Sequence, residues 1–70
     1  MKFNELLKEV RKELKISQEQ FAHELNVSFT TLNRWENDRC IPSRLAKLRI
    51  LDYCKSKNLP QDIITAFEQI

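Results

Sequence analysis

The side chains best suited to chemistry in this 70-residue chain lie in one short segment, residues 29–37. On a helical wheel, Leu32 and Trp35 point to one side, together with the flank of Glu36. The opposite side presents Phe29 at its N-terminal edge, followed by Thr30, Asn33, Arg34 and Asn37. Thr and Asn are poor helix formers, so their use on an exposed face indicates contact with a partner.

This outward face matches the edges of DNA bases. Thr and Asn offer short polar groups and a methyl, and Arg34 offers a planar fork for the O6/N7 edge of guanine. The alternative is a solvent-exposed helix that is polar without a binding role. The residue types therefore favour base contacts without excluding that alternative.

Other chemistry has little support. The ten acidic residues are dispersed, and no Ser, His and Cys constellation for catalysis occurs. Cys40 and Cys54 lack the spacing of metal ligands. Cys40 precedes the predicted fourth helix, and Cys54 lies about 16 Å along the axis from the start of that helix, which is too far for a disulfide between them. We expect two free thiols, no metal, no cofactor and no enzymatic activity.

Length and composition indicate one all-α domain spanning residues 1–70. The chain contains no glycine and two prolines, whereas hairpin turns need residues with positive φ. No apolar run approaches the roughly 18 residues of a membrane span, and no signal peptide is evident. We expect a cytoplasmic, nucleoid-associated protein.

Periodicity and capping residues predict five helices. Their approximate ranges are 4–14, 18–25, 29–37, 44–57 and 60–70. Ser17, Ser28 and Ser43 precede the second, third and fourth helices as N-caps, and Gln20 can complete a capping box with Ser17. Asn26 can end the second helix in the left-handed conformation. The second and third helices thus form a helix-turn-helix over about residues 17–37.

The last two helices are expected to complete the core. In the fourth helix the predicted core face is Leu45, Leu48, Leu51 and Cys54, widened by Ala46, Ile50 and Tyr53. In the fifth helix Ile63, Phe67 and Ile70 form one stripe, with Ile64 off it. We expect Ile64 and Ile70 to line a weak homodimer surface, unless Ile64 packs on Tyr53.

Charge is unevenly distributed. Residues 1–27 are neutral, residues 28–57 carry +4 and residues 58–70 carry −2, which gives the net charge of +2. The basic excess therefore covers the third helix, the following loop and the fourth helix. A total of +2 is low for a DNA-binding protein, and a dimer would pool two such faces.

The central part of the chain resembles the phage-repressor-like, or xenobiotic-response-element type, helix-turn-helix family. The similarity covers residues 16–42, with the sequence ISQEQFAHELNVSFTTLNRWENDRCIP. Its elements are Ser17-Gln18, Phe21-Ala22, Leu25, Val27, the block from Asn33 to Asn37, and Pro42. The family often has glycine where Asn26 and Asp38 stand. The resemblance implies a lambda-repressor-like bundle of five short helices.

The resemblance also implies roles for individual residues. Phe29, Thr30, Asn33 and Arg34 would face bases in the major groove, while Gln18, Ser28, Asn37 and Arg39 would contact the DNA backbone. Alternatives remain for several: Phe29 could be a hydrophobic staple, Ser28 mainly a helix cap, and Arg39 could pair with Asp38.

The resemblance places a structural ion pair between Arg11 and Glu36. Arg11 borders the apolar stripe of the first helix, and Glu36 lies at the edge of the core face of the third. We expect a salt bridge shielded from water that locks the third helix against the first. The alternative is that Glu36 pairs with Arg39.

These expectations combine into a small transcriptional regulator, a repressor, that binds double-stranded DNA with residues 29–37 in the major groove. The rival hypothesis is an antitoxin-type module that binds a protein partner as well as DNA. A purely structural helical domain is a further alternative, which a salt-dependent DNA-binding assay would distinguish.

Overall fold

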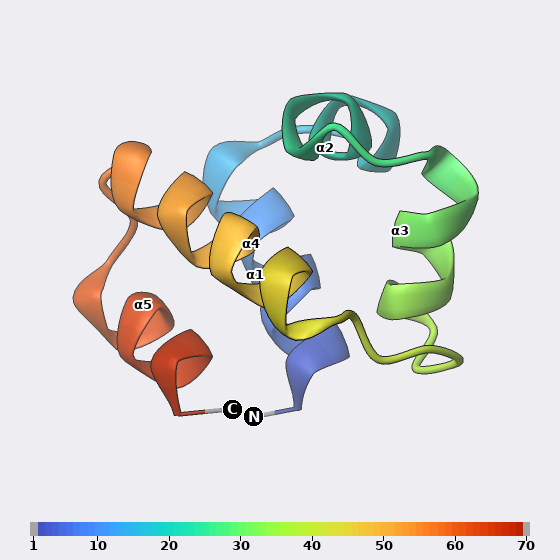
Figure 1. Ribbon diagram of the computed structural model, residues 1–70. Helices are drawn as coiled ribbons and strands as arrows, with labels where there is room; N and C mark the ends of the chain where they lie inside the picture. The colour runs from blue at the N-terminus through green and yellow to red at the C-terminus, as the bar shows by residue number, and fades with distance from the viewer. Residues whose placement is uncertain (1, 70) are drawn as a thin grey trace.

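The computed structural model describes residues 2–69, which contain five α-helices (Figure 1). In chain order they are α1 (Phe3–Leu14), α2 (Gln18–Leu25), α3 (Phe29–Glu36), α4 (Arg44–Ser56) and α5 (Gln61–Glu68). The predicted all-α architecture is confirmed. No helix within residues 2–69 is long and apolar enough to cross a lipid bilayer.

Three serines begin three of the helices, as predicted. The hydroxyls of Ser17, Ser28 and Ser43 accept hydrogen bonds from the backbone N–H three residues later, at 3.0, 3.0 and 3.2 Å. Each bond satisfies one of the amides that a helix N-terminus leaves without a partner. The predicted return contact of Gln20 was wrong: its side chain donates to Glu24, one turn along α2, at 2.7 Å.

The chain has no glycine, and within residues 2–69 four residues adopt the left-handed conformation: Lys15, Asn26, Asp38 and Asn58, with φ between 54° and 60°. Asn26 ends α2 as predicted, and the next amide, that of Val27, donates to the Ala22 carbonyl at 3.0 Å. This sharp end lets α3 begin at Phe29, so the turn of the helix-turn-helix needs only three residues.

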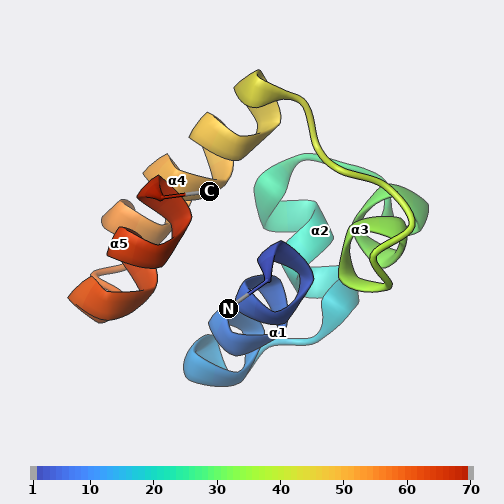
Figure 2. The ribbon, with the colours of Figure 1, turned by 90° about the horizontal axis from the view of Figure 1, so that it is seen from below.

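The helices pack as two groups around one core. Figure 2 shows α1, α2 and α3 together on one side, α4 and α5 on the other, and residues 37–43 bridging the groups. α1 contacts both α3 and α5, and α2 contacts both α3 and α4. The start of α1 lies beside the end of α5, where the Phe3 and Phe67 rings meet edge to face at 6.0 Å. α1 therefore connects α3 to the C-terminal pair of helices, through its contacts with α3 and α5.

All five helices contribute to the core. Its buried members are Leu6, Leu7, Val10, Phe21, Ala22, Leu25, Leu32, Trp35, Ile50, Cys54, Leu59, Ile63, Ile64 and Phe67. Each large apolar side chain taken out of water contributes roughly 1.5–3 kcal/mol before the entropy cost of ordering the chain. Short helices such as α2 and α3 depend on this packing, because eight residues do not form a stable helix alone.

Two predictions about the last helices were wrong. α4 turns Ile50 and Cys54 into the core as predicted, but Leu45 and Leu48, which were also predicted there, are 68% and 50% exposed. α5 packs against both α1 and α4, and its wide apolar face buries Ile64 together with Ile63 and Phe67. Ile64 is therefore not available for a homodimer surface, and Ile70 lies outside the described residues.

A polar cluster on the surface joins α2 to α4. The Tyr53 hydroxyl donates to Glu24 Oε1 at 2.5 Å, and Lys57 Nζ lies 3.6 Å from the same oxygen. These contacts lower the pKa of Glu24, chiefly through the Tyr53 hydrogen bond and then through Gln20. Burial and the bond to Glu24 raise the pKa of Tyr53. The cluster holds the first helix of the helix-turn-helix against α4.

Replacing Tyr53 by Phe should therefore destabilise the fold in a pH-dependent way. We expect a loss of about 1 kcal/mol at pH 7, at the low end for a bond to a charged group because the site is partly exposed. A carboxyl whose pKa is lowered by folding stabilises above its unfolded pKa of about 4.3, and this contribution is lost as the pH falls through the folded value. Urea unfolding of both proteins at pH 7, 5 and 3 should show the difference shrinking; an equal difference at pH 3 would contradict it.

Candidate nucleic-acid interface

The inner face of α3 is anchored by three buried side chains. Leu32 and Trp35 belong to the apolar core, and Glu36 beside them is only 2% exposed. α3 packs on both α1 and α2. Because α3 is short and is packed against α1 and α2 along one side, the opposite side of the helix faces solvent.

Glu36 is held by Arg11 of α1 through two hydrogen bonds. Arg11 Nε donates to Glu36 Oε2 at 2.8 Å, and Nη2 donates to Oε1 at 2.7 Å. The Arg11 side chain is 27% exposed, so the pair is buried on the carboxylate side and open on the guanidinium side. The bond to Glu36 raises the pKa of Arg11. The structure thus brings together the two residues that the sequence analysis paired.

The two parallel hydrogen bonds between Arg11 and Glu36 fix the relative orientation of the two groups as well as their distance. A guanidinium and a carboxylate joined by two parallel hydrogen bonds lie in one plane, so the pair also restricts rotation of one helix relative to the other. A lysine in place of Arg11 would supply the charge without this planar constraint. The ion pair therefore sets the angle of α3 relative to α1.

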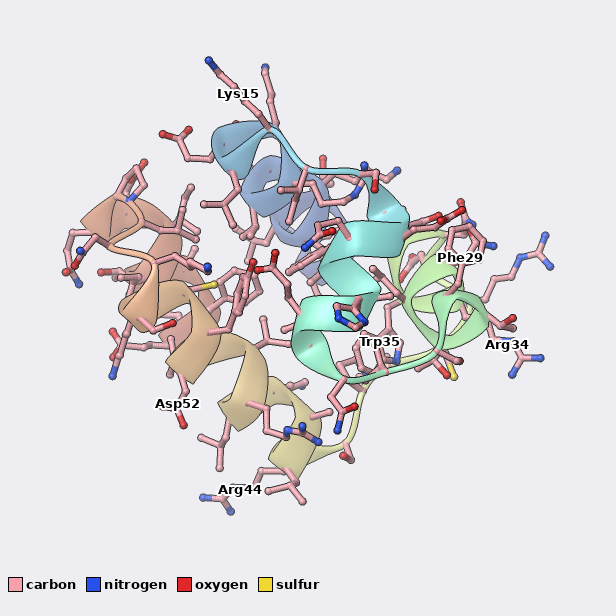
Figure 3. All side chains as sticks on the ribbon, turned by 90° about the horizontal axis from the view of Figure 1, so that it is seen from above. Lys15, Phe29, Arg34, Trp35, Arg44 and Asp52 are labelled. Atoms are coloured by element: carbon pink, nitrogen blue, oxygen red, sulfur yellow. The ribbon has the colours of Figure 1, made fainter. Side chains whose placement is uncertain are left out.

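The outer face of α3 carries the residues expected to contact bases. Thr30 and Arg34 are exposed, Phe29 is about half exposed and Asn33 is partly buried. Figure 3 shows Phe29 and Arg34 on the outer side of α3 and Trp35 toward the middle of the molecule. Within residues 2–69, Arg34 forms no ion pair, which leaves its guanidinium available to a ligand.

The residues expected at the DNA backbone surround the two ends of α3, except for Gln18. Ser28 donates to the Thr31 hydroxyl at 2.8 Å besides capping α3, so its hydroxyl proton is already engaged. Asn37 donates to the Asn33 carbonyl at 2.9 Å and thereby closes the helix C-terminus. Arg39 is exposed and pairs with neither Asp38 nor Glu36 within the described part of the chain. Gln18 lies in the first turn of α2 and is partly buried.

One contribution was not anticipated from the sequence, and a second was indicated only by the family's glycine at position 38. Thr31 supports the start of α3 by accepting from Ser28, and the Ser-x-x-Thr spacing is the signal that could have indicated it. Asp38 takes the left-handed conformation directly after α3, with φ of 58°. Arg39 then donates its backbone N–H to the Arg34 carbonyl at 2.9 Å, which closes the end of α3.

A comparison with known protein families matches residues 7–49 to the helix-turn-helix family HTH_3, which is the Cro/C1 and xenobiotic-response-element type. The matched segment covers more than half of the chain and spans α2, α3 and most of α1. The chain belongs to this family. No curated protein and no solved structure matches it.

Membership makes this helix-turn-helix protein a DNA-binding domain rather than an enzyme. DNA is accordingly its partner class. Within residues 2–69, no group of three His, Cys, Asp or Glu side chains is arranged to hold a metal ion. Cys40 is exposed and Cys54 is buried, both as free thiols, and burial raises the pKa of Cys54 to about 11.

The Arg11–Glu36 pair predicts strong energetic coupling. Arg11→Met leaves the Glu36 carboxylate buried without a partner and should cost roughly 3–5 kcal/mol, whereas Glu36→Met should cost less, because the partly exposed Arg11 can turn toward water. The double variant should recover much of that loss, because an apolar pair replaces a desolvated ionic one. Urea unfolding of the four proteins gives the double-mutant cycle.

A matched control is available on the same helix. Glu9→Met removes a carboxylate of α1 that has no ion pair within residues 2–69, and it should show little coupling to Arg11→Met. If the effects of Arg11→Met and Glu36→Met simply add, the pair does not constrain the fold.

Proposed function

We propose that this protein is a sequence-specific transcriptional regulator that inserts α3 into the major groove of double-stranded DNA and acts as a repressor. The observation that supports this most is the asymmetry of α3. One side is fixed by core packing and a two-point ion pair, and the other exposes short polar groups and an arginine without an intramolecular partner. A rigid helix that presents such groups suits base recognition.

In this proposal the residues act in two groups. Arg34 contacts a guanine edge, Asn33 and Thr30 contact neighbouring bases, and Phe29 contacts a thymine methyl. Gln18, Ser28, Asn37 and Arg39 hold the phosphates on either side and set the register of the helix in the groove. For Ser28 and Asn37 the phosphate contact uses the backbone amides near them, or requires their present hydrogen bonds to open.

Repression follows from occupancy. The described residues fold around one core, and no separate effector-binding unit is evident among them. The proposed repressor acts by occupying a promoter, in the cytoplasm where the nucleoid lies. Affinity depends on salt, because phosphate contacts release counterions.

Arg34 and Arg39 should respond differently to truncation. After a preferred site is selected from random DNA, Arg34→Ala should weaken binding to it by about 1–3 kcal/mol and relax the preference at one base position. Arg39→Ala should weaken binding to all sequences alike and reduce the salt slope by about 1 per subunit. Fluorescence anisotropy over a salt series measures both effects.

The exposed Lys8 on α1, far along the chain from α3, supplies the control, since Lys8→Ala should change neither specificity nor the salt slope appreciably. If Arg34→Ala leaves affinity and base preference for the selected site unchanged, α3 is not the recognition helix.

A further inference from the structure

A groove of about 250 Å³ lies between α4 and α5, and neither helix of the helix-turn-helix lines it. Its lining combines three large apolar side chains, two basic ones and one carboxylate: Arg44, Lys47, Leu48, Leu51, Phe67 and Glu68. Pockets that enclose a small molecule usually measure roughly 300–1,000 Å³. The groove is smaller than these, so it suits side chains that project from a larger partner.

The side of α4 that lines the groove is basic at its start and apolar further along. Arg44, Lys47, Leu48 and Leu51 follow the spacing of one helical face. Leu48 is 50% exposed, and Leu45, which precedes it by three residues, is 68% exposed. A helical face that is fully covered by a neighbouring helix is normally apolar and buried along its length. α5 therefore covers only part of this face and leaves leucine side chains beside two cations.

The positive charge of the groove has no complement within residues 2–69. Neither Arg44 nor Lys47 forms an ion pair there, and the carboxylate of the lining, Glu68, lies 3.7 Å from Lys55 Nζ. α4 as a whole carries four basic residues and one acidic residue, Asp52. Interfaces are arranged so that a positive surface meets a negative one. The charge of the groove therefore calls for an acidic occupant.

We propose that this groove binds an acidic amphipathic helix of a partner protein. Apolar residues at three- and four-residue spacing on that helix insert between Leu48, Leu51 and Phe67, as a helix does in an apolar groove. Two carboxylates one turn apart on its flank pair with Arg44 and Lys47, which are also one turn apart. The exposed Leu45 extends the apolar contact beyond the groove.

Two other anionic partners fit this surface less well. A DNA backbone supplies phosphates but no apolar groups to cover Leu45 and Leu48, and Figure 3 shows Arg44 and Arg34 at different edges of the molecule. A bilayer presents a broad surface, whereas Leu51 and Phe67 line a hollow that single side chains can enter. A protein helix meets both requirements, and its binding does not depend on whether α3 binds DNA.

A defined peptide tests the groove. The probe is a fluorescein-labelled helix of about 18 residues, long enough to be helical alone, with leucines at three- and four-residue spacing and glutamates on both flanks. We expect fluorescence anisotropy to show saturable binding to the wild type. A peptide with lysine at every glutamate position, and a scrambled peptide of the original composition, should each bind roughly tenfold or more weakly.

Variants of the groove test the residues involved. Lys47→Glu and Leu48→Glu should each weaken binding of the acidic peptide roughly tenfold, and Arg44→Glu combined with Lys47→Glu should reverse the preference toward the lysine peptide. Lys12→Glu makes the same charge change on the exposed side of α1, outside the groove, and should leave binding unchanged. Circular dichroism should show that all the variants stay folded, because none of these side chains belongs to the core.

Three results would overturn the proposal. The first is equal binding of the acidic and lysine peptides by the wild type, or amide shifts in NMR spectra that lie outside α4 and α5 when the acidic peptide is added. The second is loss of binding to random duplex DNA in Leu48→Glu, which would assign the face to DNA. The third is binding to vesicles of phosphatidylcholine and phosphatidylglycerol that Leu48→Glu abolishes, which would assign it to a membrane. The peptide assay contains no DNA, so its outcome is separate from that of the proposed function.

Discussion

The buried carboxylate of Glu36 is the constraint on which the rest of this structure depends. A charged group at this depth costs several kcal/mol to desolvate and persists only with a well-aligned partner. Arg11 supplies two hydrogen bonds at 2.7 and 2.8 Å, and it can do so only when α1 and α3 adopt one mutual orientation. The pair contributes less to net stability than to the uniqueness of that orientation.

The other features of the helix-turn-helix follow from this arrangement. Leu32, Trp35 and Glu36 are the buried residues of α3, which leaves Thr30 and Arg34 facing solvent. Ser28 and Asn37 close the two ends of α3 with hydrogen bonds of their own. The Tyr53–Glu24 bond fixes α2 to α4 from the other side. α3 is thus held along its core side and at both ends despite its length of eight residues.

Local signals in the sequence predicted local structure well. Serine caps and the left-handed Asn26 depend on residues within one turn, so Ser17, Ser28, Ser43 and the end of α2 were predictable. The pairing of Arg11 with Glu36 spans 25 positions, and spacing alone does not indicate it; it came from the family resemblance. The Tyr53–Glu24 contact spans 29 positions and depends on how α2 crosses α4, so it was missed.

The wrong predictions have a common physical origin. α4 has apolar residues at helical spacing on two faces, and periodicity does not show that Leu45 and Leu48, which were predicted to lie in the core with Ile50 and Cys54, stay exposed. α5 contacts both α1 and α4, so a stripe wider than one face is buried and Ile64 is included. In both helices, which apolar residues are buried depends on how many neighbouring helices pack against them, and this is a property of the assembled fold.

DNA specificity in the absence of the ion pair tests the central claim most directly. The Arg11→Met Glu36→Met double variant removes the two-point lock while leaving an apolar contact that keeps the protein folded. The relevant measurement is the ratio of its affinities for the selected site and for unrelated DNA, compared with wild type at the same salt concentration. We expect this ratio to fall about tenfold, equivalent to roughly 1.4 kcal/mol, with non-specific affinity unchanged. A folded double variant that keeps the wild-type ratio would show that the orientation of α3 does not depend on Arg11 and Glu36.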